Sequence, residues 1–405
     1  MIYTPETTTH SAGPKAIALK AEFLSGVSSK ARVSECPHNL YKYPARFAPE
    51  FAREAIRAFS SPGDLVMDVF QGGGTAIVEA LALGRHAVGY DISELACFLT
   101  RVKTTPLSIH DERALLAWSQ NAKFEPASIA VEAWAANDTE DGYYRRNLPD
   151  EAHQFFSTVI SQLRLLRNER QRRFARLILL AIGQWALDCK SHSPTFSEMR
   201  AEFVERLKKD LASFRSYTQN TAKTLGLPNL SLASRRKIVK SSSEHCGKNG
   251  KPLPKSVALV VTSPPYPGVH MLYHRWQIQG RRETPAPFMI ANCRDGDGAS
   301  YYNLGRRSEA GLKTYYERLV RIFAAVKPCL KPDALVVQMV AFNQPDWQLP
   351  AYLESMQQAG FEQVFPRGAA NGQLWREVPG RRWYASTGVV RREAGKEVVL
   401  FHKPA

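Results

Sequence analysis

The chain has 405 residues, of which 44% are hydrophobic and 23% are charged, and its 54 Lys and Arg against 38 Asp and Glu give a net charge of +16. This composition is typical of a globular protein, and no apolar run reaches the roughly 20 residues of a membrane-spanning helix, so a membrane span is excluded. The start of the chain lacks the pattern of a secretory signal, which predicts a cytoplasmic protein. Its six cysteines form no Cys-x-x-Cys pair, so we expect free thiols and no metal site.

The excess of positive charge lies toward the end of the chain. Residues 230–405 hold 26 basic and 13 acidic side chains, whereas residues 1–229 hold 28 and 25. Basic residues that served only to keep the protein surface hydrated would be spread evenly along the chain. The asymmetry therefore favours a polyanionic partner, above all nucleic acid.

The first third of the chain begins without a clear pattern and then alternates between helix and strand. Residues 1–35 are polar and lack periodicity, so we predict a loosely ordered arm. The strands that follow lack polar alternation, as expected for parallel strands covered on both faces. In chain order, the predicted elements are a helix at Ala48–Phe59, a strand at Asp64–Phe70, a helix at Thr75–Leu83 and a strand at His86–Tyr90.

Residues 106–229 lose the strand patterns. Apolar side chains recur at intervals of three and four from Phe155 to Leu166 and from Phe196 to Phe214, which is typical of amphipathic helices. We therefore predict a helical insertion.

After residue 230 the alternating pattern returns. The predicted strands are Arg236–Lys240, Val257–Thr262, Ala334–Ala341, Phe361–Phe365 and Glu397–His402, and the predicted helices are Lys313–Val326 and Leu349–Ala359. The fold class is thus α/β, with one Rossmann-like sheet from residues 36–105 and 230–405, covered by helices on both faces and interrupted by the insertion. Residues 267–312, rich in Gly, Pro, Arg and aromatics, are predicted to form a long functional loop within this domain.

A glycine-rich turn, Asp68-Val69-Phe70-Gln71-Gly72-Gly73-Gly74-Thr75, follows the first predicted strand. Such a turn lets a ligand approach the backbone and meet the N–H groups at the start of the next helix, although it could also serve close packing alone. It has neither the dinucleotide fingerprint nor a P-loop. Asp91 follows the second strand, where a carboxylate can accept hydrogen bonds from a ribose diol. Together the turn and this acid predict a nucleoside cofactor.

A second motif, Thr262-Ser263-Pro264-Pro265-Tyr266, directly follows an apolar strand. Two successive prolines remove two N–H donors and leave rigid carbonyls that can only accept. Ser263 adds an acceptor, and the Tyr266 ring could stack on a flat base. The motif alone could simply end a strand, but beside a cofactor turn it suits a target that arrives as an NH₂ donor.

These two motifs resemble those of the exocyclic-amino DNA methyltransferases, whose cofactor motif is similar to D-x-F-x-G-x-G-T and whose catalytic motif is [DNS]-P-P-[YFW]. The upstream stretch Tyr43-Pro44-Ala45-Arg46-Phe47 resembles the segment that closes over the methionine part of S-adenosylmethionine in this family. The resemblance covers about residues 40–105 and 235–405, and the insertion matches nothing recognised.

The resemblance implies S-adenosylmethionine as cofactor and double-stranded DNA as substrate, and it leaves open a paired restriction nuclease and the oligomeric state. The residues it assigns to the cofactor are Tyr43, Pro44, Arg46, Phe47, Asp68, Phe70, Gly72, Gly74, Thr75 and Asp91. The residues it assigns to the target base are Ser263, Pro264, Pro265 and Tyr266.

The target atom follows from the first position of the catalytic motif. Within the family, Ser at this position is commoner in the cytosine-N4 enzymes, so Ser263 favours site-specific methylation of cytosine N4 in a flipped base. Adenine N6 of DNA is the main alternative, followed by an RNA base and by an inactive fold that only binds DNA. Ring-carbon methylation would need a cysteine nucleophile, and the one candidate, Pro328-Cys329, lies where a turn is needed anyway.

Residues 267–312 directly follow the catalytic motif and are expected to contact DNA near the target base, because arginines bind phosphates and guanine edges and aromatics fill the gap of a flipped base. The alternative is a lid over the cofactor with solvated arginines. The residues predicted to contact DNA are His270, Tyr273, Arg275, Trp276, Arg281, Arg282, Arg306 and Arg307.

Overall fold

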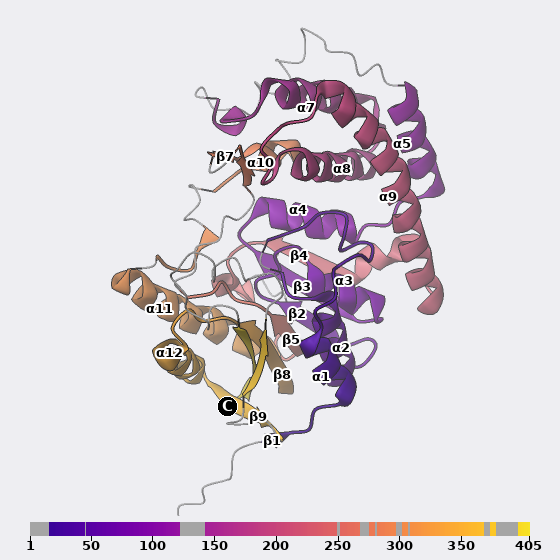
Figure 1. The fold of residues 1–405 in the computed structure, drawn as a ribbon. Helices are drawn as coiled ribbons and strands as arrows, with labels where there is room; N and C mark the ends of the chain where they lie inside the picture. Colours follow the sequence, from indigo (N-terminus) through magenta and orange to yellow (C-terminus); the bar gives the residue numbers. More distant parts are fainter. Residues whose placement is uncertain are drawn as a thin grey trace, which may run out of the picture.

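The computed structural model describes residues 16–44, 46–121, 142–248, 252–267, 275–279, 282–296, 302–306, 308–367, 373–377 and 396–405. These residues form a sheet domain and a helical lobe that lies beside one edge of the sheet (Figure 1). Within the described ranges, no helix is long and apolar enough to cross a membrane.

A mixed sheet of nine strands forms the centre of the sheet domain, in the order β1-β9-β11-β8-β5-β2-β3-β4 with β10 paired to β11. The strands are β1 (Ala16–Ile17), β2 (Leu65–Asp68), β3 (His86–Asp91), β4 (Arg236–Lys240), β5 (Val257–Thr262), β8 (Leu330–Val340), β9 (Phe361–Pro366), β10 (Leu374–Glu377) and β11 (Lys396–Pro404). The strands from β4 to β8 pair in parallel, whereas β11 runs antiparallel between β8 and β9. Chain order reverses between β2 and β5, and in parallel sheets ligands bind outside the carboxyl ends of the strands at such a point.

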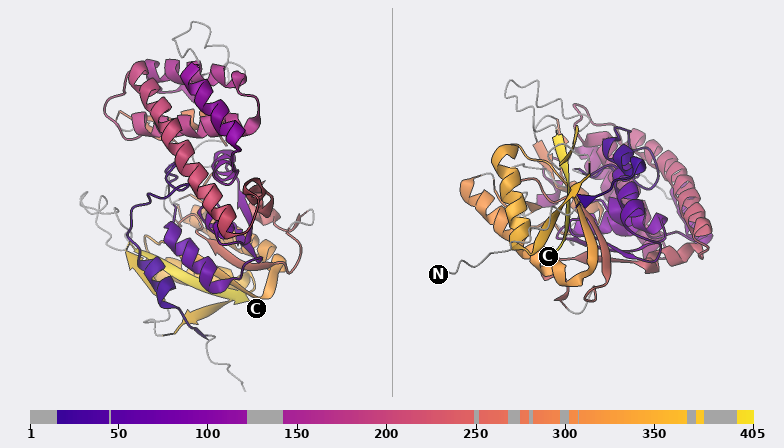
Figure 2. Two further views of the ribbon diagram at one scale, coloured as in Figure 1. Left: turned by 90° about the vertical axis from the view of Figure 1, so that its right-hand side faces the viewer. Right: turned by 90° about the horizontal axis from the view of Figure 1, so that it is seen from below.

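Both faces of the sheet are covered, because neighbouring residues of each central strand contribute to two different apolar clusters. Val66 and Val337 pack with the first helices, whereas Met67 and Val336 pack with the late ones. Figure 2 shows the two helical layers on either side of the strands. The helices of these layers are α1 (Ala21–Ser28), α2 (Pro49–Phe59) and α3 (Thr75–Ala82) on one face, and α11 (Glu309–Val326) and α12 (Pro345–Gln358) on the other.

The predicted α/β fold with helices on both faces is confirmed. The strands β4 and β5 have the predicted bounds, and the other predicted strands and helices are present with ends shifted by a few residues. The prediction of a loosely ordered arm is wrong for residues 16–28. Phe23 of α1 is fully buried against Phe51, Phe59 and Phe401, so this segment is part of the core.

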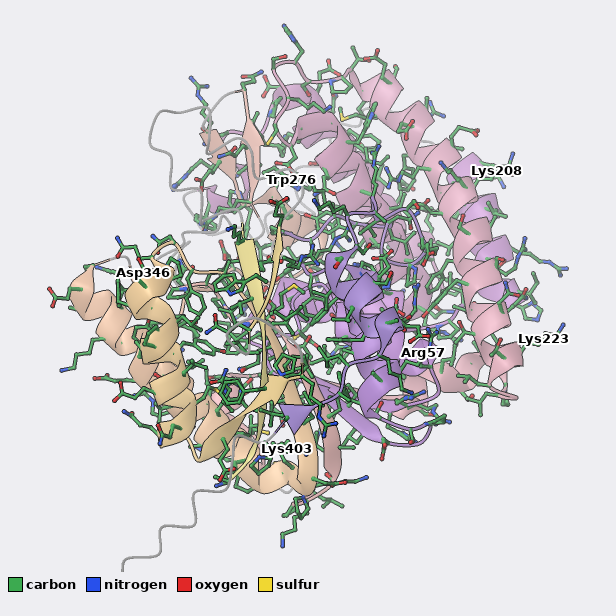
Figure 3. All side chains as sticks on the ribbon, turned by 60° about the horizontal axis from the view of Figure 1, so that its bottom comes forward. Arg57, Lys208, Lys223, Trp276, Asp346 and Lys403 are labelled. Atoms are coloured by element: carbon green, nitrogen blue, oxygen red, sulfur yellow. The ribbon has the colours of Figure 1, made fainter. Side chains whose placement is uncertain are left out.

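The helical lobe is built from the described parts of residues 106–229, where the predicted helices are present. Its helices are α5 (Ile109–Asn121), α7 (Asp150–Gln162), α8 (Glu169–Leu187) and α9 (Phe196–Thr224). The long helix α9 begins with a capping box of Thr195 and Glu198, and its Lys208 and Lys223 project outward (Figure 3). Helix α4 (Glu94–Lys103) follows β3 and shares the apolar core of the lobe, so it joins the two parts.

Short 3-10 helices connect the longer elements. They are η1 (Tyr143–Arg145), η2 (Leu163–Leu165), η3 (Asn229–Arg235), η4 (Ser243–His245) and η7 (Lys327–Cys329).

Residues 267–312 were predicted to form a loop of the sheet domain, but their described parts pack mainly with the helical lobe. They form β6 (Trp276–Ile278), β7 (Arg282–Thr284) and α10 (Ala286–Ile290). The Trp276 ring lies against α8 where a Cβ on Gly183 would be only 2.0 Å from it. The periodicity of short, interrupted elements gives no sign of which core they will join, since that depends on contacts distant in sequence.

We expect Phe23→Ala to destabilise the protein by about 3–5 kcal/mol, because it leaves a cavity among three aromatic rings. Urea unfolding measures the loss. The matched control is the neighbouring Leu24→Ala, whose side chain is exposed and should cost less than about 1 kcal/mol. Equal stability of the two variants would show that α1 does not contribute to the core.

Candidate active site

The glycine turn after β2 has a backbone that favours glycine. Gly72 and Gly74 have φ angles of 49° and 79°, in the left-handed region. The ring of Tyr43 packs directly over the turn, because a Cβ on Gly72 or Gly73 would lie 2.9 or 2.7 Å from Tyr43 atoms. The Tyr43 ring can lie this close to the turn only because these positions carry no side chain.

Asp91, at the end of β3, holds the turn from the side. Its Oδ2 accepts a hydrogen bond from the Gly72 N–H at 2.9 Å and its Oδ1 from the Ser93 N–H at 2.8 Å. Burial raises the pKa of this carboxyl to about 6. A carboxylate oxygen has two lone pairs, so each can also accept from a ligand hydroxyl.

Asp68 ties the turn to the strand that carries the second motif. Its Oδ1 accepts from Thr262 Oγ1 at 2.7 Å and from the Phe70 N–H at 3.0 Å. The carboxyl is almost fully buried, and burial raises its pKa to about 7. These hydrogen bonds join β2 to β5 at the reversal of strand order.

Two residues of α4 support the turn from below and were not singled out from the sequence. Thr100 Oγ1 donates to the Gly72 carbonyl at 3.2 Å, and Lys103 Nζ donates to the Gly73 carbonyl at 3.3 Å. Lys103 is buried, and this burial lowers its pKa to about 7. Their spacing of three places both on one helix face, but only the packing of α4 shows that this face meets the turn.

The second motif follows β5 on the opposite side of the same crevice. The hydroxyl of Tyr315 on α11 donates to the Pro265 carbonyl at 2.8 Å and so fixes the proline pair. The Tyr266 hydroxyl donates to Glu397 Oε1 at 2.6 Å, and its side chain is buried. Tyr266 therefore does not offer the open stacking face predicted from the sequence, since its ring is part of the core beside α11.

A pocket lies between the two motifs and is lined by residues of both. It brings together six of the predicted residues, namely Tyr43, Phe70, Gly72, Asp91, Ser263 and Pro265. The lining residues not predicted as site residues are Val69, Ile92, Ser93, Ser241, Ser242, Ser243, Tyr302, Asn303, Leu304, Arg318 and Ile322. The serines directly follow β4, a position at the same sheet edge that could have been singled out from the strand pattern.

The remaining predicted cofactor residues lie around the pocket and not in its wall. Asp68, Gly74 and Thr75 belong to the strand end, the turn and the start of α3, and Pro44 is half-buried next to Tyr43. Pro264 lies between the two motif residues that line the pocket.

The predictions for Arg46 and Phe47 need correction. Arg46 Nη1 donates to the His38 carbonyl at 2.6 Å, and Phe47 packs edge-on against Phe51 in the core. Both side chains contact other parts of the protein, and of the upstream segment the pocket is lined by Tyr43 and not by Arg46 or Phe47.

The prediction that Arg275 and Trp276 contact DNA is also wrong in this structure. Arg275 is almost fully buried in an ion pair with Asp295 at 2.6 Å, and Trp276 is 1% exposed. Arg282 and Arg306 are exposed, as predicted for contact residues. His270, Tyr273, Arg281 and Arg307 lie outside the described residues.

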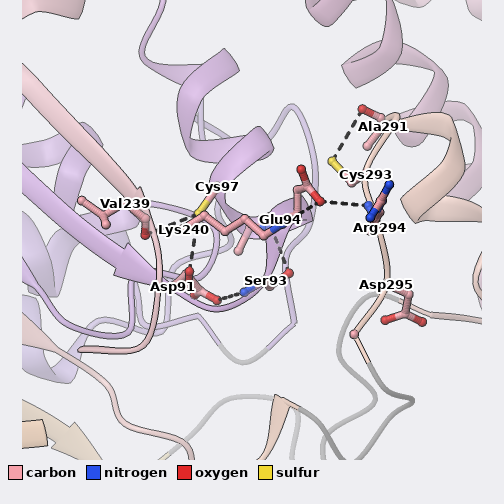
Figure 4. Close-up of polar contacts among 12 residues, drawn as sticks. Asp91, Ser93, Glu94, Cys97, Val239, Lys240, Ala291, Cys293, Arg294 and Asp295 are labelled. Atoms are coloured by element: carbon pink, nitrogen blue, oxygen red, sulfur yellow. Dashed lines mark hydrogen bonds and ion pairs between the residues drawn. The ribbon is translucent and has the colours of Figure 1, made fainter. Parts of the chain in front are cut away.

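The helical lobe approaches the pocket at the start of α4. Glu94 Oε2 accepts hydrogen bonds from Lys240 Nζ and from the Arg294 N–H, both at 3.0 Å (Figure 4). The segment around Arg294 therefore lies beside the edge of the sheet where Asp91 and Ser93 hold the turn.

Comparison with known proteins finds that residues 16–101 match a family model described as DNA methylase, for N6 and N4 enzymes. Residues 16–101 are therefore similar to the N6/N4 DNA methylases. Similar proteins include the type II methyltransferase M.MjaII of Methanocaldococcus jannaschii, 28% identical over 90 residues, and M.MvaI of Kocuria varians, 36% identical over 76 residues. These matches cover 22% and 18% of this chain and 17% of each relative, so they concern a part of the relatives only.

The solved structures similar to this chain share less of its sequence. TrmN from Thermus thermophilus has a TM-score of 0.33 and 12% identity, with 88% of this chain and 49% of the other covered. A geranyl diphosphate C-methyltransferase from Streptomyces coelicolor A3(2), solved with S-adenosyl-L-homocysteine, has a TM-score of 0.33 and 8% identity, with 87% and 78% covered.

The chemistry of the pocket fits S-adenosylmethionine, the cofactor that the similarity to the N6/N4 DNA methylases implies. The turn leads into the start of α3, where the first backbone N–H groups have no acceptor within the helix, and apolar Phe70 and Ile92 can flank a flat base. Asp91 provides acceptors for the ribose, and its negative charge suits a cationic ligand.

We expect Asp68 to make the protein less stable as the pH rises. Its pKa is about 7 in the folded protein against an ordinary value of 3.8, so between pH 4 and pH 7 the folded state keeps a proton that the unfolded chain has lost. The unfolding free energy from this group therefore falls with rising pH in this window. Relative to the wild type, Asp68→Asn should gain on the order of 2 kcal/mol from pH 4 to pH 8, measured by urea unfolding.

The control for this experiment is Asp64→Asn, at the other end of β2. Burial opposes its ionisation, but the ion pair with Lys331 at 2.8 Å holds the pKa of Asp64 below its ordinary value. This variant should lose stability relative to the wild type as the pH rises from 2 to 5. A parallel pH response of both variants would contradict the assignment.

Proposed function

We propose that this chain is a site-specific DNA methyltransferase that transfers the methyl group of S-adenosylmethionine to the N4 amine of cytosine in a base flipped out of double-stranded DNA. The observation that carries the proposal is that Ser263 and Pro265 line the same pocket as Gly72 and Asp91. One pocket can thus hold a cofactor at the turn and a base amine at the motif.

The chain's residues would act on the nitrogen of the target amine. Its lone pair is conjugated into the ring, which makes it a poor nucleophile. Ser263 Oγ and the Pro264 carbonyl oxygen would each accept a hydrogen bond from one of the two N–H groups of the amine. These hydrogen bonds would localise the lone pair on the nitrogen and orient it. S-adenosylmethionine supplies an electrophilic methyl group, so a covalent bond between enzyme and base is not needed. Tyr315 contributes by holding the Pro265 carbonyl, which keeps the proline pair rigid.

The cofactor residues proposed here are Tyr43 and Phe70 as walls, the glycine turn with Thr75 as backbone donors, and Asp91 as the ribose acceptor. Support comes from the contacts of Tyr43 with Gly72 and from the direct hydrogen bond between Asp91 and the turn. Asp68 would act through the turn and not by direct contact.

The DNA surface would lie where the helical lobe meets the pocket. Exposed Arg282 and Arg306 flank this region. Exposed Arg145, at the end of η1, and Arg146, directly after it, adjoin the region because Asn147 Nδ2 donates to the Glu283 carbonyl at 2.9 Å. Such arginines would bind phosphates, and flipping the base would cost a few kcal/mol.

We expect Ser263→Ala to reduce turnover by about 10²-fold while the affinity for S-adenosylmethionine stays within twofold, because Ser263 would face the amine. Asp91→Ala should do the reverse and weaken cofactor binding at least tenfold, since it removes the ribose acceptor and frees the turn. Calorimetry and single-turnover methylation separate the two effects. Loss of cofactor affinity in Ser263→Ala would contradict the assignment.

Methylation of a mixed DNA panel, followed by modified-base sequencing, identifies the target. N4-methylcytosine supports the proposal, whereas N6-methyladenine would show that the adenine alternative holds. Methylation of RNA alone, or cofactor binding without methylation, would contradict it.

Replacing Arg282 and Arg306 with Ala should weaken DNA binding and lower the slope of log affinity against log salt by about one for each lost phosphate contact. The matched control is Arg172→Ala with Arg173→Ala on α8, whose guanidinium groups already pair with Glu169. Cofactor affinity should not change in either variant. A larger loss of DNA binding in the α8 variant would place the DNA surface on the helical lobe away from the pocket.

A further inference from the structure

One wall of the pocket comes from a residue that the helical lobe holds in place. Tyr302 lines the pocket and precedes Asn303 and Leu304, which line it too. Its hydroxyl donates to Asp295 Oδ1 and accepts from the Gly296 N–H, both at 2.7 Å. The hydroxyl therefore has a donor and an acceptor partner in fixed positions.

The carboxylate of Asp295 is itself held by the lobe. Its Oδ2 accepts from Arg275 Nη2 at 2.6 Å and from the Tyr143 hydroxyl at 2.7 Å. The Asp295 N–H donates to the Tyr144 hydroxyl at 3.2 Å. The Asp295 side chain is 1% exposed and that of Arg275 is 9% exposed, so this charge pair is almost free of solvent screening.

The ring of Tyr302 is fixed as well as its hydroxyl. It stacks on Phe288 of α10 with 6.1 Å between ring centroids and an angle of 17° between planes. Phe288 is fully buried in the core of the lobe. Both the position and the tilt of this pocket wall are therefore set by residues outside the sheet.

We propose that Asp295 is a positioning residue, which uses Arg275 and Tyr143 to hold the Tyr302 ring against the cofactor pocket, so that the helical lobe sets the pocket's affinity for S-adenosylmethionine. The inference rests on the cofactor site of the proposed function. It does not depend on which nucleic acid or base is methylated. Networks of this kind orient a site residue because each polar atom has only one arrangement in which it is satisfied.

The test measures S-adenosylmethionine affinity by calorimetry in the full chain without DNA. Tyr302→Phe keeps the ring and removes the hydroxyl, and it should weaken binding about fivefold. Asp295→Asn should have a similar effect, because an amide has only one oxygen and cannot accept hydrogen bonds from Tyr302 on one side and from Arg275 and Tyr143 on the other. Combined, the two changes should weaken binding no more than about twofold beyond either one, since both release the same ring.

The matched control is Tyr316→Phe on α11, whose hydroxyl donates to the Gln348 carbonyl at 3.3 Å outside the pocket lining. It should leave the affinity within twofold, and the melting temperatures of Tyr302→Phe and Tyr316→Phe should be similar. Unchanged affinity in Tyr302→Phe, or effects of Tyr302→Phe and Asp295→Asn that multiply, would overturn the proposal. A wild type that does not bind S-adenosylmethionine would overturn it too, whereas binding without DNA methylation would contradict only the proposed function.

Discussion

The carboxyl group of Asp68 lies between β2 and β5 and accepts hydrogen bonds from Thr262 and from the Phe70 N–H. One of these bonds fixes the residue before Ser263, and the other fixes the first part of the glycine turn. The two motifs directly follow β2 and β5, and this side chain joins these two strands. The distance between the motifs therefore depends on a buried acid and not on flexible loops. Burial keeps the interaction free of competition from water, and it raises the pKa of the acid to about 7.

The turn itself is compressed from several sides. Tyr43 lies over Gly72 and Gly73, Asp91 accepts from the Gly72 N–H, and Lys103 donates to the Gly73 carbonyl. Tyr43 fills space that a side chain on the turn would need, and Asp91 and Lys103 form hydrogen bonds with its backbone. A backbone held in this way keeps its shape without a ligand, so binding would not need the turn to reorganise.

The helical lobe contributes directly to the structure around the pocket. It shares the core of α4, contacts the end of β4 through Glu94 and Arg294, and supplies the clamp on Tyr302. The residues after the catalytic motif leave the sheet, pack into the lobe at Trp276 and return to the pocket at Tyr302. The pocket is therefore completed only when both parts of the chain are folded together.

The sequence alone determined the α/β class, the bounds of β4 and β5, the helical character of the insertion and the two motifs, because hydrophobic period, glycine spacing and proline pairs are local properties. It also led to Asp91 and Ser263, which follow strands at the same sheet edge. Only the tertiary structure decided that Phe23 belongs to the core, that Trp276 and Arg275 are buried, and that Tyr302 forms a pocket wall. An exposed arginine and one paired with a buried carboxylate look the same in a sequence, since the partner, Asp295, is 20 residues away and the contact depends on how two separate segments pack.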